Sequence, residues 1–159
     1  MIEIRHKATG SLLATVEGPS LAGADLRDMD LAGADLAGLD LSGANLEYSD
    51  LSAADLGGAR LAGANLTAAH LPGTILRGAD LSRVRLGADS PSRAADVSGA
   101  DLTQAHLAGA DLRRVEGRGA ILRDACLDGA DLRGLELPGA GLSGVRARKA
   151  LFIQANLRE

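Results

Sequence analysis

The amino-acid sequence predicts an all-β solenoid, a chain wound into stacked coils, and three observations support this fold class. A leucine recurs at every fifth residue from Leu21 to Leu86, and the step resumes at Val97 and runs to Leu157. A small residue, usually alanine, stands two positions before each leucine, and glycine often stands two positions after it. Together these features describe a five-residue unit in which the chain bends once per repeat.

A spacing of five residues excludes the two common regular structures as the source of this pattern. In an α-helix five residues turn the chain by about 500°, so successive leucines would spiral around the axis and form no apolar stripe. In a β-strand five is an odd number, so successive leucines would point to opposite faces. The chain must therefore turn within every repeat to bring each leucine back to the same interior.

The positions around the leucine predict which side chains point inward. Residues two apart share a face in extended backbone, so the alanine and the leucine both face the core and the residue between them faces outward. The outward residue is usually Asp or Asn, as at Asp25, Asp35, Asn45, Asp55, Asn65, Asp101 and Asp131. The following glycine supplies turn dihedrals without steric cost, as at Gly23, Gly33, Gly43, Gly63, Gly109 and Gly129. Each unit therefore predicts one side of a coil and one corner.

The motif Ala-[Asp/Asn]-Leu-x-x, repeated in this way, resembles the pentapeptide-repeat family. The resemblance covers residues 19–159 and is specific, because the unit recurs 27 times. Known members form a right-handed quadrilateral β-helix with four repeats in each coil, and the resemblance implies the same architecture here. The period of five does not by itself give the number of sides.

An irregular loop at residues 89–94 interrupts the repeat and shifts its phase by one residue. Residues 19–88 hold 14 units and residues 95–159 hold 13. We interpret the six loop residues as one further side with a one-residue insertion, which gives 28 units, or about seven coils. Within the regular part, Gly117 stands where a core leucine is usual and predicts a local weak point.

The segment before the repeat, residues 1–18, predicts a cap for the first coil. Residues 2–5 alternate between apolar and polar, residues 7–10 have turn composition, and residues 12–16 are apolar and β-prone. Two such stretches around a turn indicate a β-hairpin. The predicted domain organisation is therefore a hairpin cap at 1–18 and a single β-helical domain at 19–159.

The other end of the repeat carries an apolar group. Leu151 and Ile153 occupy outward positions on either side of the central residue Phe152. Two interpretations stay open. One is local repacking around Phe152, and the other is an edge that a homodimer buries through the C-terminal coil, because exposed apolar clusters often mark interfaces.

Composition and missing signals limit the class of protein. The chain carries 17 basic and 21 acidic residues, a formal net charge of −4, and one cysteine, so it forms no internal disulfide. It has neither an apolar run of about 20 residues that could cross a membrane nor the apolar stretch of a signal peptide. With the family resemblance, these absences predict a soluble bacterial protein of the cytoplasm.

The sequence shows no constellation for catalysis, cofactor binding or metal binding. It contains no P-loop, dinucleotide fingerprint, metal-type cysteine pair or nucleophile elbow. His70 and His106 take outward positions on different predicted sides, and Cys126 takes an outward position without a histidine partner. We interpret all three as ordinary surface residues, and we expect a protein that is not an enzyme and binds no cofactor or metal.

Counting the loop as a side places a group of acidic residues in one column. Its members are Asp35, Asp55, Asp96, Glu116 and Glu136, with Ile75 among them. Neighbours in such a column lie about 5 Å apart, so their like charges repel. One interpretation is that these carboxylates bind the local turns. The other is an acidic interaction stripe that meets a basic partner.

A basic group also falls on one predicted side. Its members are Arg93, Arg113, Arg114 and Arg133, with Asp111 and Asp131 among them. We interpret this group as a mixed, salt-bridged face rather than as a basic binding surface. The chain has one tyrosine and one phenylalanine and no tryptophan, so it lacks a base-stacking surface, and its net negative charge opposes direct nucleic-acid binding.

The leading functional hypothesis is a non-enzymatic structural or protein-interaction scaffold with an unidentified protein partner. The alternative comes from the resemblance. Some pentapeptide-repeat proteins mimic B-form DNA, bind DNA gyrase and other type II topoisomerases, and give quinolone resistance or self-protection. This chain departs from them in its weak negative charge, in a core of leucine rather than phenylalanine, and in the absence of a C-terminal dimerising helix.

Overall fold

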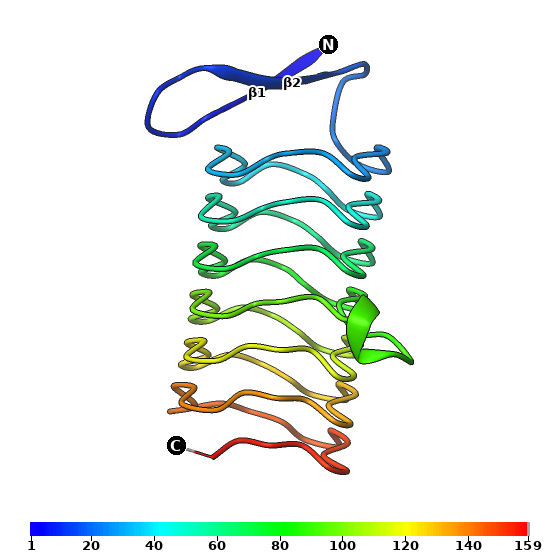
Figure 1. Cartoon of the computed structure of the whole chain (residues 1–159), viewed down its shortest axis with the longest axis vertical. Helices are drawn as coiled ribbons and strands as arrows, with labels where there is room; N and C mark the ends of the chain where they lie inside the picture. The colour runs from blue at the N-terminus through cyan, green and yellow to red at the C-terminus, as the bar shows by residue number, and fades with distance from the viewer. Residues whose placement is uncertain (159) are drawn as a thin grey trace.

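The computed structural model describes residues 1–158 and shows a rod of stacked coils with a hairpin at its N-terminal end (Figure 1). Within residues 25–85, and again within residues 96–156, outward residues that are 20 positions apart pair through parallel backbone bridges, as Asp25 does with Asn45 and Asn45 with Asn65. One coil therefore holds four five-residue units, which gives the rod four sides. The solenoid predicted from the leucine step is confirmed.

Each corner of the rod is a four-residue turn closed by a backbone hydrogen bond. At the first regular corner the Ala24 N–H donates to the Leu21 carbonyl at 3.1 Å, and Gly23, the third residue of the turn, has a φ of 69°. This combination is typical of a type II turn and favours glycine at the third position. Where another residue stands there φ stays positive, as at Ala53 (53°) and Lys149 (58°). Among residues 1–158 no β-branched side chain occupies such a position, because the second heavy atom on its Cβ would crowd the backbone there.

The core consists of the leucines at the centre of each side. Leu26, Leu46 and Leu66 lie on the same side of successive coils and are each 0% exposed. Most of the alanines two residues earlier are buried with them. Thr74 takes one of these alanine positions, and its buried hydroxyl oxygen lies 2.8 Å from each of two backbone carbonyl oxygens. Burying a leucine side chain contributes about 1.5–3 kcal/mol to folding. Because the coils above and below provide this burial, the stability of each coil depends on its neighbours.

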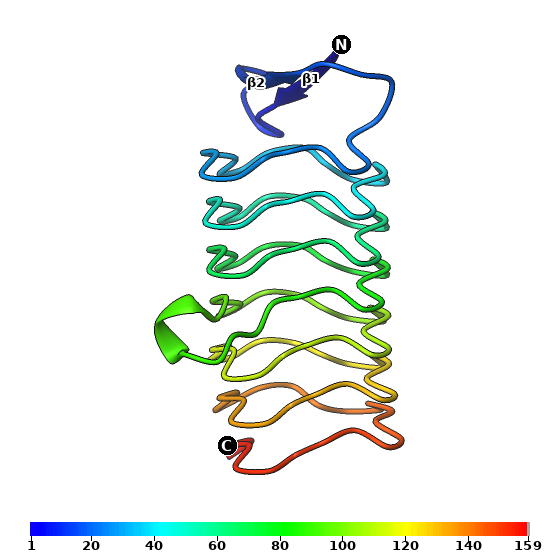
Figure 2. The same cartoon turned by 90° about the vertical axis from the view of Figure 1, so that its right-hand side faces the viewer.

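The N-terminal hairpin consists of β1 (Ile2–Arg5) and β2 (Leu12–Val16), which pair in antiparallel register. It lies across the end of the rod (Figures 1 and 2). The Asp35 N–H donates to the Arg5 carbonyl at 2.8 Å, which joins the hairpin to the first coil. Ile4 is 1% exposed and packs in the same apolar core as the leucines. The hairpin is therefore held by both backbone pairing and side-chain burial.

The loop at residues 89–94 leaves the stack at a corner and returns to the same corner. It contains the 3-10 helix η1 (Pro91–Arg93), none of whose residues is buried (Figure 2). Asp96 pairs with His70, 26 positions earlier, rather than with Ile75. The five-residue unit that contains Asp96 therefore follows directly on the unit that precedes the loop, and the loop lies outside the repeat.

The prediction that this loop forms one side of a coil is therefore wrong. Its six residues offer no leucine to the core, and Pro91 has no N–H for the ladder between coils. Placing them at a corner costs no core contact, whereas placing them in a side would open a gap in the apolar stack. As a result, every unit after the loop lies one side away from its predicted position.

Deleting residues 89–94 and replacing Ala88 with glycine is expected to leave the β-helix folded. The deletion joins residue 88 to Ala95 in an unbroken five-residue phase, and glycine suits the positive φ of the new corner. It removes the exposed ion pairs of Asp89 and Arg93, each worth about 0–1 kcal/mol. Thermal denaturation followed by circular dichroism should show a midpoint lowered by less than about 8 °C. Deleting six residues inside the repeat, 54–59, shifts the phase of the repeat by one residue and should abolish the cooperative transition. Similar unfolding curves for the two deletions would contradict the assignment of residues 89–94 to a loop outside the repeat.

Neighbouring coils fill most of the space at Gly117. A Cβ at this position would lie 2.3 Å from Leu137 Cδ2 and 2.8 Å from Val97 Cγ2. These side chains therefore lean into the volume that a leucine would occupy. A cavity of about 20 Å³ with purely aliphatic lining, between Leu86 and Leu137, is what the packing leaves open. Val97 and Leu137 both line this cavity, and the local weak point at Gly117 stays a prediction.

Candidate functional site

The outward residues of successive coils stack into four columns, one on each side of the rod, which we name after their first members. The Asp30 column contains Asp30, Asp50, His70, Asp96, Glu116, Glu136 and Asn156. The Asp35 column contains Asp35, Asp55, Ile75, Asp101, Ile121 and Gly141. The Asp25 column contains Asp25, Asn45, Asn65, Arg85, Asp111, Asp131 and Leu151. The Asp40 column contains Asp40, Arg60, Asp80, His106, Cys126 and Arg146.

The predicted acidic stripe is wrong in its membership, because it counted the loop as a side. The two members before the loop, Asp35 and Asp55, lie in the Asp35 column, and the three members after it lie in the Asp30 column. The structure adds Asp30 and Asp50 to those three. One side of the rod thus carries five carboxylates, in a set that sequence reasoning missed. The signal was present, because removing residues 89–94 restores an unbroken repeat and assigns every column correctly.

The aspartates of the Asp30 column each bind the corner that follows them. The backbone N–H two residues later donates to the carboxylate of Asp30 at 3.2 Å, of Asp50 at 2.8 Å and of Asp96 at 2.9 Å. Burial alone would raise the pKa of Asp50, but hydrogen bonds from Ser52 and the nearby His70 outweigh it and lower that pKa. These aspartates therefore have a structural role in their turns, and the lowered pKa keeps Asp50 negatively charged.

The glutamate side chains of the same column do not bind the corners that follow them. Glu116 and Glu136 are exposed, and the side chain of Glu116 makes no hydrogen bond or ion pair within residues 1–158. Glu136 accepts a hydrogen bond from Asn156 Nδ2 at 2.7 Å. His70 is the one member of the column that can become cationic, and its Nδ1 lies 3.6 Å from Asp96 Oδ2. The column is therefore predominantly anionic, and its lower half presents carboxylates that no turn engages.

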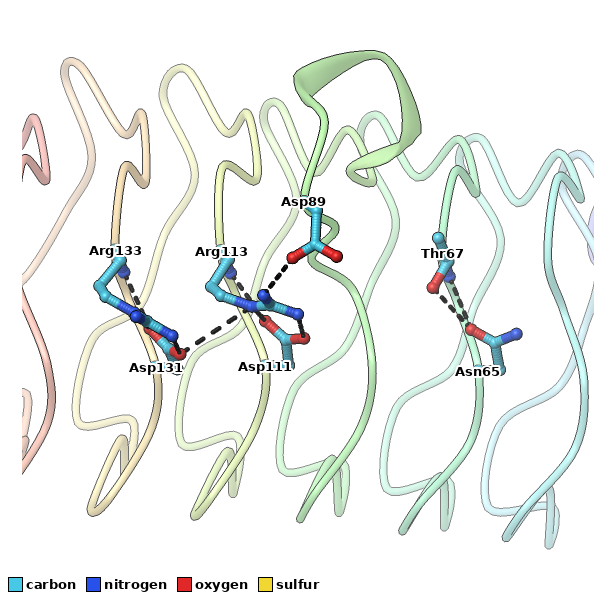
Figure 3. Close-up of polar contacts among 7 residues, drawn as sticks. All are labelled: Asn65, Thr67, Asp89, Asp111, Arg113, Asp131 and Arg133. Atoms are coloured by element: carbon cyan, nitrogen blue, oxygen red, sulfur yellow. Dashed lines mark hydrogen bonds and ion pairs between the residues drawn. The ribbon is translucent and has the colours of Figure 1, made fainter.

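Ion pairs fill the corner between the Asp25 and Asp30 columns (Figure 3). Arg113 donates to both carboxylate oxygens of Asp111, from Nε at 2.9 Å and Nη2 at 2.8 Å, and to Asp89 of the loop from Nη1 at 2.5 Å. Arg133 binds Asp131 in the same forked way, at 2.8 and 2.6 Å. These contacts raise the pKa of Arg113 and lower that of Asp131. The mixed, salt-bridged face predicted for these residues is present.

Neutral groups replace these ion pairs higher in the same column. The Thr67 hydroxyl donates to Asn65 Oδ1 at 2.7 Å, and the Thr67 N–H donates to the same oxygen at 3.2 Å (Figure 3). Asn65 Nδ2 in turn donates to Asn45 Oδ1, one coil away, at 3.1 Å. The outward Asp or Asn of the repeat therefore has a common role, which is to accept hydrogen bonds from the corner that follows it.

Arg93 lies apart from the arginines with which the sequence grouped it. From the loop it reaches toward the N-terminal end, where Nη2 donates to Glu47 Oε1 at 2.5 Å and Nε donates to the Tyr48 hydroxyl at 3.2 Å. Its guanidinium lies 6.0 Å from the centre of the Tyr48 ring. The hydrogen bonds from Arg93 to Tyr48 and Glu47 raise the pKa of Arg93. The loop is thus fastened both to earlier coils through Arg93 and to the next coil through Asp89.

The residue types that could carry metal or redox chemistry are dispersed. His70 and His106 lie in different columns, as the sequence predicted. Cys126 is half-buried, and its sulfur accepts a hydrogen bond from Arg146 Nη2 at 2.9 Å. Within residues 1–158 no group of three His, Cys, Asp or Glu side chains is arranged to hold a metal ion. Over the same residues, no helix has the length and apolar character that crossing a bilayer requires.

The C-terminal coil exposes the apolar residues that the sequence singled out. Leu151 is 48% exposed, Phe152 43% and Ile153 65%. This edge of the described coils is therefore apolar.

The exposed pair formed by Asp25 and Arg27 predicts a measurable pH dependence. Arg27 donates to both carboxylate oxygens, at 2.8 and 2.6 Å, and lowers the pKa of Asp25 to about 2. Because this value lies below the ordinary one, the stabilisation is complete above about pH 4 and is lost as the pH falls toward 2. The substitution Arg27→Gln should return the Asp25 pKa toward 3.8, measured by NMR titration, whereas Arg123→Gln should not change it. An Asp25 that still titrates near 2 without Arg27 would contradict the assigned cause.

Solved structures similar to this chain are repeat proteins. Rfr23 of the cyanobacterium Cyanothece 51142 is 34% identical, with 74% of this chain and 63% of that chain covered and a TM-score of 0.35. HetL of Nostoc sp. strain PCC 7120, a protein involved in regulating heterocyst differentiation, is 31% identical over 82% of this chain and 73% of that chain, with a TM-score of 0.26. QnrB1, a plasmid-mediated fluoroquinolone resistance protein, is 18% identical over 76% of this chain and 68% of that chain, with a TM-score of 0.48. The chain thus spans less than two thirds of Rfr23.

The repeat itself identifies the family. No curated protein matches the chain. The family model for pentapeptide repeats matches residues 14–47, 49–87 and 95–134, with 8 copies of the repeat, which is well over half of the sequence. The matched segments run from the end of β2 through coils on either side of the loop, and none of them includes residues 89–94. The chain belongs to the pentapeptide repeat family.

Proposed function

We propose that the chain is a non-enzymatic scaffold for protein interaction and that its Asp30 column is the surface that binds a basic partner. The observation that carries this proposal is the stacking of five carboxylates on one flat side of the rod. The fold holds them at strand spacing, about 4.8 Å per coil. A rigid row of charges at fixed intervals suits recognition of a complementary row on another protein.

The electrostatics of the column favour a bound partner. Like charges about 5 Å apart repel by roughly 1 kcal/mol in bulk water. Three neighbouring pairs of carboxylates in the Asp30 column have this arrangement: Asp30 with Asp50, Asp96 with Glu116, and Glu116 with Glu136. Basic side chains from a partner would relieve this repulsion, and the gain would appear as binding affinity that falls as salt rises.

Neutralising the column tests the proposal. In the triple variant Asp30→Asn, Glu116→Gln and Glu136→Gln, three charges disappear while the hydrogen-bonding capacity of the side chains remains. The matched control, Asp35→Asn with Asp55→Asn and Asp101→Asn, removes the same charge from the Asp35 column. We expect a partner captured by the parent protein to bind the control at parental affinity and the test variant at least tenfold more weakly. Equal binding of both variants would show that the Asp30 column has only a structural role.

The alternative function, DNA mimicry directed at gyrase, makes a different prediction. The net charge of −4 is spread over a rod whose 27 units give a height of about 32 Å, or one net charge per roughly 8 Å. Duplex DNA carries one charge per about 1.7 Å of its axis. We therefore expect no protection of DNA gyrase from a quinolone in a supercoiling assay. Protection that the Asp30-column variant loses would instead favour mimicry.

We also propose finer features of the architecture. The rod has about seven coils, and the N-terminal hairpin acts as a cap that keeps the first coil from associating with other chains. A second copy of the chain is the proposed partner for the C-terminal edge, where Leu151, Phe152 and Ile153 are exposed. Sedimentation should show a dimer at high concentration that Phe152→Asp abolishes, and a monomer throughout would contradict this dimer.

A further inference from the structure

A hollow of about 290 Å³ lies at the corner between the Asp25 and Asp30 columns, below the loop. The residues that give it its chemistry are Asp89, Arg113, Arg114, Arg133, Ile153 and Gln154. They come from three successive coils and from the first residue of the loop. The hollow is therefore created by the insertion, which forms its upper edge, and by the C-terminal coil, which forms its lower edge.

The guanidinium groups in this hollow differ in how many of their nitrogens already bind a carboxylate. Arg113 directs all three of its nitrogens to carboxylates, namely Asp111 and Asp89. Arg133 binds Asp131 through Nε and Nη2 and leaves Nη1 free within residues 1–158. Arg114 is exposed, and its side chain has no hydrogen bond or ion pair in the same part of the chain. The hollow thus has unused donors one coil apart, at Arg114 and at Arg133.

The chain itself shows which ligand chemistry this corner accepts. Asp89 on the loop has a side chain that is 93% exposed, and its carboxylate lies 2.5 Å from Arg113 Nη1. One of the three arginines, Arg113, therefore already binds the carboxylate of a residue that lies outside the coils. The forked donors of arginine match a second and a third carboxylate equally well.

The lower end of the hollow is apolar. Ile153 is 65% exposed and lies two coils below Arg114. Two coils span about 9.6 Å, and a peptide in the polyproline II conformation advances about 3.1 Å per residue and returns to the same face at every third residue. An acidic residue placed at Arg114 would therefore have its third neighbour along the peptide at the level of Ile153.

We propose that this hollow binds an acidic, extended segment of a protein partner, with carboxylates on Arg114 and Arg133 and an aliphatic side chain on Ile153. The site goes beyond the function proposed above, because it takes a ligand of opposite charge at a different part of the rod. Asp111 and Asp131 border the arginines. Their negative charges would repel a continuous phosphate backbone. Separate carboxylates that each bind one guanidinium would avoid this repulsion.

The test uses a fluorescein-labelled eight-residue peptide with two glutamates and a leucine three positions after the first, at protein concentrations where sedimentation shows a monomer. Arg114→Gln should weaken binding about 3- to 10-fold, measured by fluorescence anisotropy. Arg123→Gln removes an arginine from another corner and should leave it unchanged. Ile153→Ser should weaken binding of the leucine peptide but not of a peptide with serine in its place. The Asp30-column triple variant should bind the peptide as the parent does, so the two proposals fail independently.

Several outcomes would overturn the proposal. One is the absence of binding to the parent protein at 1 mM peptide. Another is an equal effect of Arg114→Gln and Arg123→Gln, which would mean that only net charge matters. A third is tighter binding of a single-stranded oligonucleotide than of the acidic peptide with the same dependence on Arg114, which would make the hollow a nucleic-acid site.

Discussion

Replacing Leu56 with alanine is expected to lower the free energy of unfolding by about 2–5 kcal/mol. Leu56 is 0% exposed and lies in the second coil, between Leu36 and Leu76 on the same side of the rod. Truncation leaves a cavity that rigid neighbouring coils cannot close. Because each coil of a solenoid is stabilised by its neighbours, the loss also weakens the coupling between the coils on either side of Leu56.

Leu142 provides the matched comparison, because it occupies the same side of the last full coil. It is half-buried, and no coil described by the structure packs below it. Leu142→Ala should therefore cost less than about 1.5 kcal/mol. Urea denaturation followed by circular dichroism gives both values. Equal losses at the two positions would show that the coils do not stabilise one another in the way the stack implies.

Replacing Ile4 with aspartate is expected to detach the N-terminal hairpin from the rod. Ile4 is 1% exposed within the apolar core, and an unpaired carboxylate there costs several kcal/mol. The Asp35 N–H donates to the Arg5 carbonyl of the hairpin, whereas the Asp55 N–H donates to the Ala34 carbonyl of the preceding coil. Detachment should therefore expose the Asp35 amide and leave the Asp55 amide protected.

Hydrogen exchange of these two amides measures the effect. In Ile4→Asp the Asp35 amide should exchange at least about tenfold faster, with little change at Asp55. Leu12→Asp is the control, because Leu12 lies on the same hairpin but is 52% exposed. Parallel acceleration at both amides would mean global destabilisation rather than loss of the hairpin. Unchanged exchange at Asp35 would mean that Ile4 does not hold the hairpin in place.

Much of the fold could be predicted from the residues because the repeat is local. The five-residue step assigned Leu26 and Leu66 to the core, and both are fully buried. Glycine at the third turn position predicted the corners, and Gly23 has the positive φ that such a turn needs. Inward and outward positions follow from a single unit of five residues, so no long-range information was required.

The register across the loop could not be obtained in the same way. Six residues can be read as one side with an insertion or as a loop outside the stack, and both readings keep the leucines inward. Contacts 26 residues apart, such as that between His70 and Asp96, decide between them. The candidate surface depended on this choice, so Asp30 and Asp50 were missed and Asp35 and Asp55 were wrongly included.

The sequence alone determined that this protein is a pentapeptide solenoid with a leucine core, because steric and hydrophobic requirements repeat within every five residues. The tertiary structure alone decided which outward residues share a side, because stacking joins residues that are 20 or 26 positions apart. It also decided that Arg113 holds Asp89 and leaves a hollow beside Arg114. A side chain's neighbours on the surface belong to other coils, and no local pattern specifies them.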